Sequence, residues 1–285
     1  MSVDLHSHST ISDGSYTPTE LARAFAAYGI KIAALTDHDT VGGVAEFLEA
    51  CGPLNIQGIT GIEFSTVYKG QEVHLLGYGL DLNNPKCAGF LAGHADYLRE
   101  RCEDTLGKLK RYGFDIPIEE VYEFSSGNPP MPPHILRVLS KQGLIDDLAE
   151  AVNFFHEYLA FGGKAWVGHE TLLEAPLKML IDTGAVAIVA HPSRLRESGW
   201  LEEILDLGAH GFELYYPDHV GAVFDELQGV ALKRGCLVTG GCDYHGAFAH
   251  RKICEVPVPL EVGVKLLEAV GQEVPPYLYE EAGMK

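Results

Sequence analysis

Basic residues are scarce in this chain of 285 residues. Lysine and arginine together number 21 against 40 aspartates and glutamates, which gives a formal net charge of −19. Binding to long nucleic acid draws its free energy from basic surfaces, so we expect no long nucleic acid among the partners. Small phosphorylated molecules remain possible ligands, because metal ions and a few well-placed cationic side chains can hold one or two phosphates whatever the net charge.

Long apolar runs are also missing. No stretch approaches the roughly 20 apolar residues that a membrane-spanning helix needs. The N-terminus passes directly into Asp4 and His6, without a charged segment followed by an apolar one. We therefore expect a cytoplasmic protein with no membrane contact.

Closely spaced cysteines are absent too. The six cysteines are scattered and contain no C-x-x-C pair. Disulfide frameworks and thiolate zinc sites depend on such pairs, so the sequence predicts neither. Cys242, beside Asp243, is expected to be a small buried residue.

Seven short apolar runs are typical of β-strands, and a hydrophobic content of 46% is ample for a core. The runs cover residues 2–6, 31–36, 57–62, 72–78, 185–190, 211–215 and 236–241. Helix-like segments lie between several of them; one opens at Thr17-Pro18-Thr19-Glu20, which has capping-box spacing and a proline at the first helical position. Alternating strands and helices form parallel sheets, and polar residues gather where these runs end. The pattern predicts an α/β fold in which about seven strands form a barrel.

The stretch from residue 83 to residue 168 interrupts this alternation with a helical pattern. Helices are expected at 85–112, 117–124, 132–142 and 147–161, with a Gly-Asn-Pro-Pro breaker at 127–130. We interpret the stretch as a helical insertion that acts as a substrate lid over a barrel made of residues 1–82 and 169–256. The alternative is a solvated helical hairpin that only packs on the barrel. Residues 257–285 form a separate C-terminal segment, whose tail from 275 is expected to be loosely ordered.

Histidines beside carboxylates follow most of the strand-like runs. Alternate residues on a strand face the same side, so His6 and His8 can bind one metal ion, and Asp13 returns an oxygen ligand to the same place. Similar side chains follow later runs: His38, Glu63, His74, His191, Asp243 and His245. A lone histidine at a strand end is more often a packing residue. A core, however, has no use for so many unpaired imidazoles and carboxylates, so these nine residues predict a cluster of divalent metal ions and a hydrolase.

These motifs resemble one known family. D-L-H-S-H-S-x-x-S-D-G, L-T-D-H-D-T, G-I-E-x-S, H-x-x-G, A-H-P and G-x-D-x-H-G, in this order, are similar to the polymerase and histidinol phosphatase (PHP) family. Within it, the helical insertion resembles that of small metal-dependent phosphoesterases. The resemblance covers residues 4 to about 251 and implies a distorted (β/α)7 barrel with two or three divalent ions, commonly Mn²⁺.

The resemblance also implies how the ligands are shared. One ion is bound by His6, His8 and Asp243, and a second by His74 and His191, with Glu63 bridging the two. A third is bound by Asp13, His38 and His245. Mixed imidazole and carboxylate ligands suit Mn, Fe or Zn better than Ca or Mg.

The expected reaction is hydrolysis of P–O ester bonds in a small phosphorylated sugar or nucleotide, either a monoester or a cyclic diester. Two ions about 4 Å apart activate a bridging hydroxide for attack on phosphorus. Glu63, Asp13 and His191 are the candidate catalytic residues. Cationic donors for the phosphate are expected at Arg137 with His134, at Lys164 and at Arg194, because a guanidinium meets two phosphate oxygens at once.

Several alternatives stay open. A nucleoside 3′,5′-bisphosphate phosphatase or a short-RNA 5′–3′ exonuclease is one, although similar enzymes often have an arginine where this chain has Pro132. A histidinol-phosphate phosphatase is another. A C–N amidohydrolase would need a carboxylated lysine where Glu63 stands. A non-catalytic phosphoanion-binding protein would usually lack some of the nine ligands. The residues leave the organic part of the substrate and the oligomeric state open.

Overall fold

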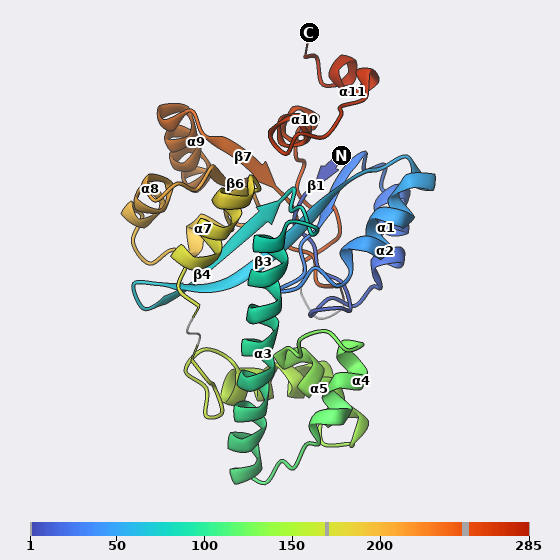
Figure 1. The fold of residues 1–285 in the computed structure, drawn as a ribbon, viewed down its shortest axis with the longest axis vertical. Helices are drawn as coiled ribbons and strands as arrows, with labels where there is room; N and C mark the ends of the chain where they lie inside the picture. Colours follow the sequence, from blue (N-terminus) through green and yellow to red (C-terminus); the bar gives the residue numbers. More distant parts are fainter. Residues whose placement is uncertain (1, 169–170, 247–250, 285) are drawn as a thin grey trace.

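The chain folds around a curved seven-stranded sheet (Figure 1). The computed structural model describes residues 2–168, 171–246 and 251–284. The strands follow one another in sequence order: β1 Val3–Asp4, β2 Ile32–Leu35, β3 Gln57–Tyr68, β4 Gln71–Tyr78, β5 Val186–Val189, β6 Gly211–Tyr215 and β7 Leu237–Gly240. Just after β1, the backbone N–H of Leu5 donates to the carbonyl of Gly240 (3.1 Å), so the first strand lies beside the last. The predicted α/β fold with seven strands is confirmed.

One prediction about the sheet is wrong, because it is mixed rather than parallel. β4 pairs antiparallel with both β3 and β5, whereas the remaining strand pairs are parallel. β3 is longer than expected and joins β4 through Lys69 and Gly70, both of which have positive φ (48° and 77°). Two left-handed residues in a two-residue loop form a tight hairpin, which leaves no room for a crossover helix.

Helices cover the outer face of the sheet. They are α1 Pro18–Ala27, α2 Val44–Cys51, α7 Glu174–Thr183, α8 Gly199–Asp206 and α9 Ala222–Arg234, with short 3₁₀ turns η1 Gly52–Leu54 and η3 Pro192–Arg194. The predicted capping box of α1 is confirmed: the Thr17 side chain accepts from the N–H of Glu20, and the Glu20 carboxylate accepts from the N–H of Thr17 (2.9 Å).

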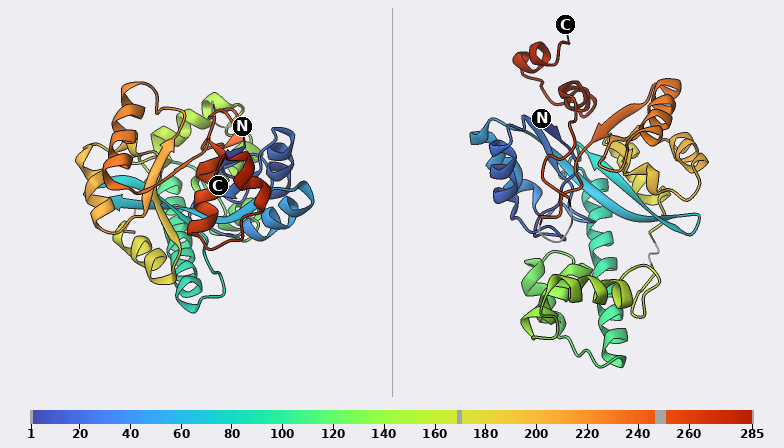
Figure 2. Two further views of the ribbon diagram at one scale, coloured as in Figure 1. Left: turned by 90° about the horizontal axis from the view of Figure 1, so that it is seen from above. Right: turned by 180° about the vertical axis from the view of Figure 1, so that it is seen from behind.

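The segment between β4 and α7 is helical and projects from one end of the barrel (Figures 1 and 2). It contains α3 Pro85–Arg111, α4 Ile118–Ser125, α5 Pro132–Lys141, α6 Leu148–Phe154 and a π-helical turn, η2 Phe155–Leu159. Buried side chains of its outer part, among them Leu109, Val138 and Leu139, form an apolar cluster separate from those of the barrel, whereas Cys87 at the start of α3 belongs to a barrel cluster. The expected boundary at residue 169 lies outside the described residues.

A buried polar contact ties this insertion to the barrel. His94 of α3 places Nε2 2.8 Å from Oδ1 of Asp39, and both side chains are buried. The same Asp39 oxygen accepts from the backbone N–H of Ser65 on β3 (2.9 Å). Since Asp39 directly follows His38, α3 is anchored next to a predicted metal ligand.

The C-terminal segment packs at the end of the barrel opposite the insertion (Figure 2). It comprises α10 Leu260–Ala269 and α11 Pro276–Glu281. The expectation of a loose tail is wrong for these residues, because Val274 and Leu278 are buried in the same apolar cluster as Val3 and Ile32. Lys285 lies outside the described residues. Among the helices of the described part of the chain, none is both long and apolar enough to cross a membrane.

Candidate metal centre

Glu63 lies at the middle of a histidine cluster. Its side chain is fully buried, and each carboxylate oxygen faces a different set of imidazoles. Oε2 lies 3.0 Å from Nε2 of His6, 3.1 Å from Nε2 of His8 and 3.4 Å from Nδ1 of His38, whereas Oε1 lies 3.0 Å from Nδ1 of His74 and 3.2 Å from Nε2 of His191. One carboxylate is therefore shared by two groups of nitrogen atoms.

Two further carboxylates complete the cluster. Oδ1 of Asp243 lies 3.4 Å from Nε2 of His6 and 3.2 Å from Nε2 of His8. Asp13 approaches His245 (3.2 Å), His8 (3.5 Å) and His38 (3.8 Å). The structure thus brings all nine predicted metal-ligating residues together.

The direction of β4 explains how His74 reaches this place. His74 lies in the first half of its strand and Glu63 in the middle of β3, whereas the other candidate ligands lie beyond the carboxyl ends of theirs. Because β4 runs opposite to its neighbours, its first half lies at the edge where the parallel strands end. The prediction that the ligands lie at the ends of strands is therefore wrong for His74 and for Glu63, although both belong to the cluster as expected.

The donor atoms form three overlapping groups. These are His8, Asp13, His38 and His245; His6, His8, Glu63 and Asp243; and His38, Glu63 and His74, with the ligand atoms of each group within 4.8 Å of one another. The first two contain the expected trios. His191 belongs to none of the three groups but faces Oε1 of Glu63.

The chemistry of these atoms fits metal ions. Both ring nitrogens of His8 and Nδ1 of His38 are buried and have no hydrogen-bond partner among the described residues, although carboxylate oxygens lie close by. Buried polar atoms are normally hydrogen-bonded. Metal ligands direct their donor atoms toward a shared position instead of bonding to one another, and these atoms are arranged in that way.

Electrostatics support the same conclusion. Burial alone would raise the pKa of Glu63, but the surrounding imidazoles of His6, His38 and His74 hold it well below its usual range. Burial opposes the charging of His8 and His74, yet the neighbouring carboxylates raise the pKa of each to about 10. Without cations, this cluster keeps its carboxylates charged only by protonating imidazoles.

Glu213 supports the cluster and was missed by the sequence reasoning. Its Oε1 lies 2.9 Å from Nδ1 of His6, and its Oε2 accepts from the backbone N–H of His191 (2.7 Å). The side chain is fully buried. A carboxylate that orients a ligating histidine is typical of metal sites. The only available signal was a glutamate within the apolar strand Gly211–Tyr215.

The backbone at two candidate ligands is unusual. His191 has φ of 29° and Asp243 has φ of 51°, values that L-residues rarely adopt. The hydrogen bond from the N–H of His191 to Glu213 and one from the N–H of Asp243 to the carbonyl of His6 (2.9 Å) hold these conformations. Such strain persists only where the surroundings enforce it, as they do here.

Gly241 allows β7 to approach the first strand closely. A Cβ atom at this position would lie 2.4 Å from the backbone nitrogen of His6 and 2.8 Å from Oδ1 of Asp4. We expect Gly241→Ala to lower the free energy of unfolding by about 1–3 kcal/mol, the usual effect of overpacking, and to reduce metal content. Thermal unfolding and metal analysis would measure both.

Gly229→Ala is the matched control. Gly229 is in α9, is exposed, and has no atom within 4 Å of the added Cβ position. Alanine should stabilise this helix by about 0.5–1 kcal/mol. Equal stability of the two variants would contradict the close-approach argument.

The predicted phosphate-binding residues fall into different environments. Arg194 lies at the cluster: its Nη2 is 3.7 Å from Oδ2 of Asp243, and half of its side chain is exposed. It also borders a hollow that His74 and His191 line. Lys164 instead forms an ion pair with Glu157 within the insertion, and both side chains are about half exposed. Among the described residues, no recorded contact joins Lys164 to the cluster.

His134 and Arg137 connect α5 to the loop after His8. Arg137 donates to the carbonyls of Thr10 (3.4 Å) and Gly14 (2.8 Å), on either side of Asp13. His134 is buried, and its Nδ1 accepts from the N–H of Met131 (2.9 Å), which leaves Nε2 without a hydrogen-bond partner among the described residues. Burial, followed by the charge of Arg137, lowers the pKa of His134 to about 4. Arg137 therefore helps to position the loop of Asp13, and His134 lies one helical turn before it on α5.

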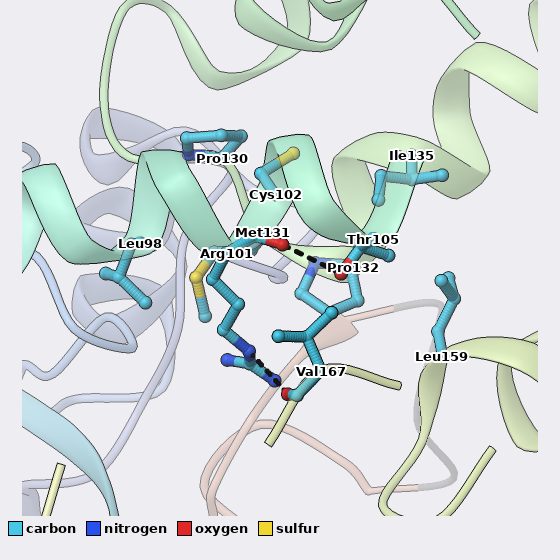
Figure 3. A pocket seen from close by; sticks show the side chains of 10 residues that line it. All are labelled: Leu98, Arg101, Cys102, Thr105, Pro130, Met131, Pro132, Ile135, Leu159 and Val167. Carbon is cyan, nitrogen blue, oxygen red and sulfur yellow. Dashed lines mark hydrogen bonds between the residues drawn. The ribbon is translucent and has the colours of Figure 1, made fainter. Parts of the chain in front are cut away.

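A second hollow lies between α3 and the start of α5 (Figure 3). Its lining is mainly apolar and includes Pro132, Leu98 and Ile135. Arg101 supplies a guanidinium whose Nε donates to the carbonyl of Val167 (3.1 Å). A cationic group thus lies near Pro132, where the sequence suggested that one was lost.

Comparison with known proteins places these features in a family. The PHP domain model matches residues 4–207, which include seven of the nine candidate ligands and stop before Asp243 and His245. A 5′-3′ exoribonuclease of Haemophilus influenzae is 31% identical over 80% of this chain and 83% of its own. A 3′,5′-nucleoside bisphosphate phosphatase of Chromobacterium violaceum is 31% identical over 85% and 87%. A phosphoribosyl 1,2-cyclic phosphate 1,2-diphosphodiesterase of Eggerthella lenta is 27% identical over 86% and 94%.

Solved structures share the architecture. A Bifidobacterium adolescentis protein assigned as a metal-dependent phosphoesterase superposes with a TM-score of 0.85 over 97% of this chain and 98% of its own, at 22% identity. An amidohydrolase from Chromobacterium violaceum, with bound sulfate and no metal, gives a TM-score of 0.78 over 94% and 97%, at 27% identity. The barrel and its helical insertion thus occur together in known proteins.

Proposed function

The chain belongs to the PHP domain family, and from this and the geometry of its candidate metal centre we propose that it is a metal-dependent phosphoesterase acting on a small phosphorylated sugar or nucleotide. The observation that carries the proposal is the buried carboxylate of Glu63, whose two oxygens face two separate sets of imidazoles. A carboxylate in this arrangement is suited to bridge two cations. An amidohydrolase with a carboxylated lysine would need a lysine at that position.

The ligands would be shared as the sequence suggests. His6, His8 and Asp243 would hold one ion, and His74 and His191 a second, with Glu63 between them. Asp13, His38 and His245 would hold a third. The donor set suits Mn, Fe or Zn, and we propose Mn²⁺.

When bound, divalent ions would lower the pKa of a water molecule and polarise the phosphate oxygens. The protein's own residues orient this chemistry. With Nδ1 of His6 directed at Glu213, its Nε2 is left to face Glu63 and Asp243. We assign Glu63, Asp13 and His191 to the reacting centre, and Arg194 to the phosphate.

A small substrate agrees with the charge of the chain. At a formal net charge of −19, the surface offers little to a long phosphate backbone. Arg194 and the hollow beside His74 can accept a single phosphate ester. The relatives named above act on a cyclic phosphate, a bisphosphate and RNA, so the organic part of the substrate must be found by experiment.

Phosphate release from a substrate panel tests the proposal. Protein loaded with Mn²⁺ is incubated with nucleoside 3′,5′-bisphosphates, cyclic sugar phosphates, histidinol phosphate and short RNA. We expect release from one class, abolished by a chelator and restored by Mn²⁺. No release from any class by protein that has bound metal would overturn the proposal.

A further inference from the structure

The two carboxylate oxygens of Asp243 have different partners, because Tyr216 binds one of them. The Tyr216 ring is buried, and its hydroxyl donates to Oδ2 of Asp243 (2.8 Å), whereas Oδ1 faces His6 and His8. The tyrosine therefore leaves one oxygen of Asp243 for the metal and holds the other.

Two guanidinium groups lie against the same ring. Cζ of Arg251 is 4.6 Å from the ring centroid of Tyr216, and Cζ of Arg194 is 5.5 Å away, both within the range of cation–π contact. Nη2 of Arg251 also donates to the Tyr216 hydroxyl (3.0 Å). Arg194 Nη2 lies 3.7 Å from Oδ2 of Asp243. The Tyr216 hydroxyl and Oδ2 of Asp243 therefore link the two guanidinium groups through a chain of polar contacts.

These cations are incompletely neutralised. Arg251 pairs with Asp218 (2.8 Å), whose side chain is 58% exposed, and exposed ion pairs contribute little stability. Only Nη2 of Arg251 is used in the bonds recorded within the described chain. A guanidinium has five N–H donors, and within the described residues the donors on Nε and Nη1 of Arg251 have no recorded bond and can meet a ligand. Binding of metal at Oδ1 would further reduce the charge that Asp243 offers to Arg194.

From this arrangement we infer that Arg251 is a second anion-binding residue, which forms with Arg194 a two-guanidinium clamp on Tyr216 for the phosphate of the substrate. The inference rests on the proposed phosphoesterase function and extends it, because the sequence singled out Arg194 alone at this side of the cluster. Its ligand is a phosphate group, recognised by paired N–H donors. Asp218 competes with that ligand for Arg251.

Binding of inorganic phosphate to the Mn²⁺-loaded protein, measured by calorimetry, tests the clamp. We expect Arg251→Ala to weaken phosphate binding by about tenfold, since it removes a charge-assisted hydrogen bond, and to leave metal content unchanged. Arg251→Lys should recover only part of the affinity, because an ammonium lacks the paired geometry. Arg196→Ala is the control: Arg196 is an exposed arginine two residues beyond Arg194, and its removal should change nothing.

Weaker phosphate binding in Arg251→Ala could result from misfolding, so a second variant is chosen that should bind phosphate more tightly. Asp218→Asn removes the competing carboxylate and should tighten phosphate binding a few-fold, in line with the roughly 0–1 kcal/mol of an exposed ion pair. Unchanged affinity in both Arg251→Ala and Asp218→Asn would overturn the inference. So would loss of metal in parallel with loss of phosphate in Arg251→Ala, because Arg251 would then act only through Tyr216 and Asp243.

Phosphate binding requires no turnover, so this experiment is separate from the substrate panel. Phosphate binding that depends on Arg251, in a protein that hydrolyses nothing, would contradict the phosphoesterase proposal and uphold the anion site. Hydrolysis with an unchanged KM in Arg251→Ala would uphold the phosphoesterase proposal and contradict the role of Arg251 in binding the phosphate.

Discussion

Glu63→Gln is expected to abolish phosphate release almost completely. Losing an outer hydrogen-bond partner at a metal site costs about 10- to 100-fold in affinity or activity, and a shared ligand should cost more. Glutamine keeps the size of the side chain, but its amide nitrogen cannot accept or ligate. One of the two sets of imidazoles that Glu63 joins would therefore lose its carboxylate oxygen. Steady-state rates with saturating Mn²⁺, together with metal analysis, would measure the effect.

Glu203→Gln is the matched control for Glu63. Glu203 is in α8 on the outside of the barrel, where its carboxylate accepts from the hydroxyl of Tyr68 (2.7 Å) and pairs with Lys69. Its replacement should leave both activity and metal content unchanged. Full activity in Glu63→Gln would exclude the bridging role and, with it, the arrangement proposed for the ions.

Asp243→Asn and His191→Ala are each expected to abolish activity in a protein that remains folded. Asparagine keeps an oxygen for the Tyr216 hydroxyl but removes the negative charge near His6 and His8. Alanine at position 191 removes the imidazole that faces Oε1 of Glu63 (3.2 Å). Each variant should therefore bind fewer equivalents of metal while circular dichroism shows an unchanged barrel.

The corresponding control is His156→Ala. His156 is an exposed histidine in the π-helical turn of the insertion, and its loss should affect neither metal nor rate. The double variant Asp243→Asn, His191→Ala gives the most severe test. Turnover that survives in this protein at saturating Mn²⁺ would refute the assignment of both residues as ligands.

The parts of the fold that the sequence predicted are those with a local signal. Short apolar runs located all seven strands, and alternation along one strand placed His6 and His8 on the same side. Spacing did not reveal strand direction, because an apolar run looks the same in either orientation. The sign of an antiparallel strand was there, in Lys69-Gly70, whose two positive φ angles form the hairpin turn.

Supporting residues were harder to predict for a different reason. Glu213 lies 207 residues from His6 and belongs to no motif with it, so only the fold shows that the two meet. Tyr216 and Arg251 are likewise brought together by the packing of separate elements. Lys164 follows two glycines, a pattern that suggested a phosphate site; in the structure its ammonium pairs with Glu157, seven residues away, and its role toward phosphate stays a prediction.

The hairpin of β3 and β4 also bears on the order in which the barrel assembles. Glu63 and His74 are 11 residues apart, so their contact closes with a short loop, whereas His6 must find partners across most of the chain. Contacts between near neighbours cost less chain entropy and tend to form early. The topology therefore favours early formation of the Glu63–His74 contact. The residues on the other side of Glu63, His6 and Asp243, would come together only when β7 pairs late with the first strand, so that the same step completes the metal site and the barrel.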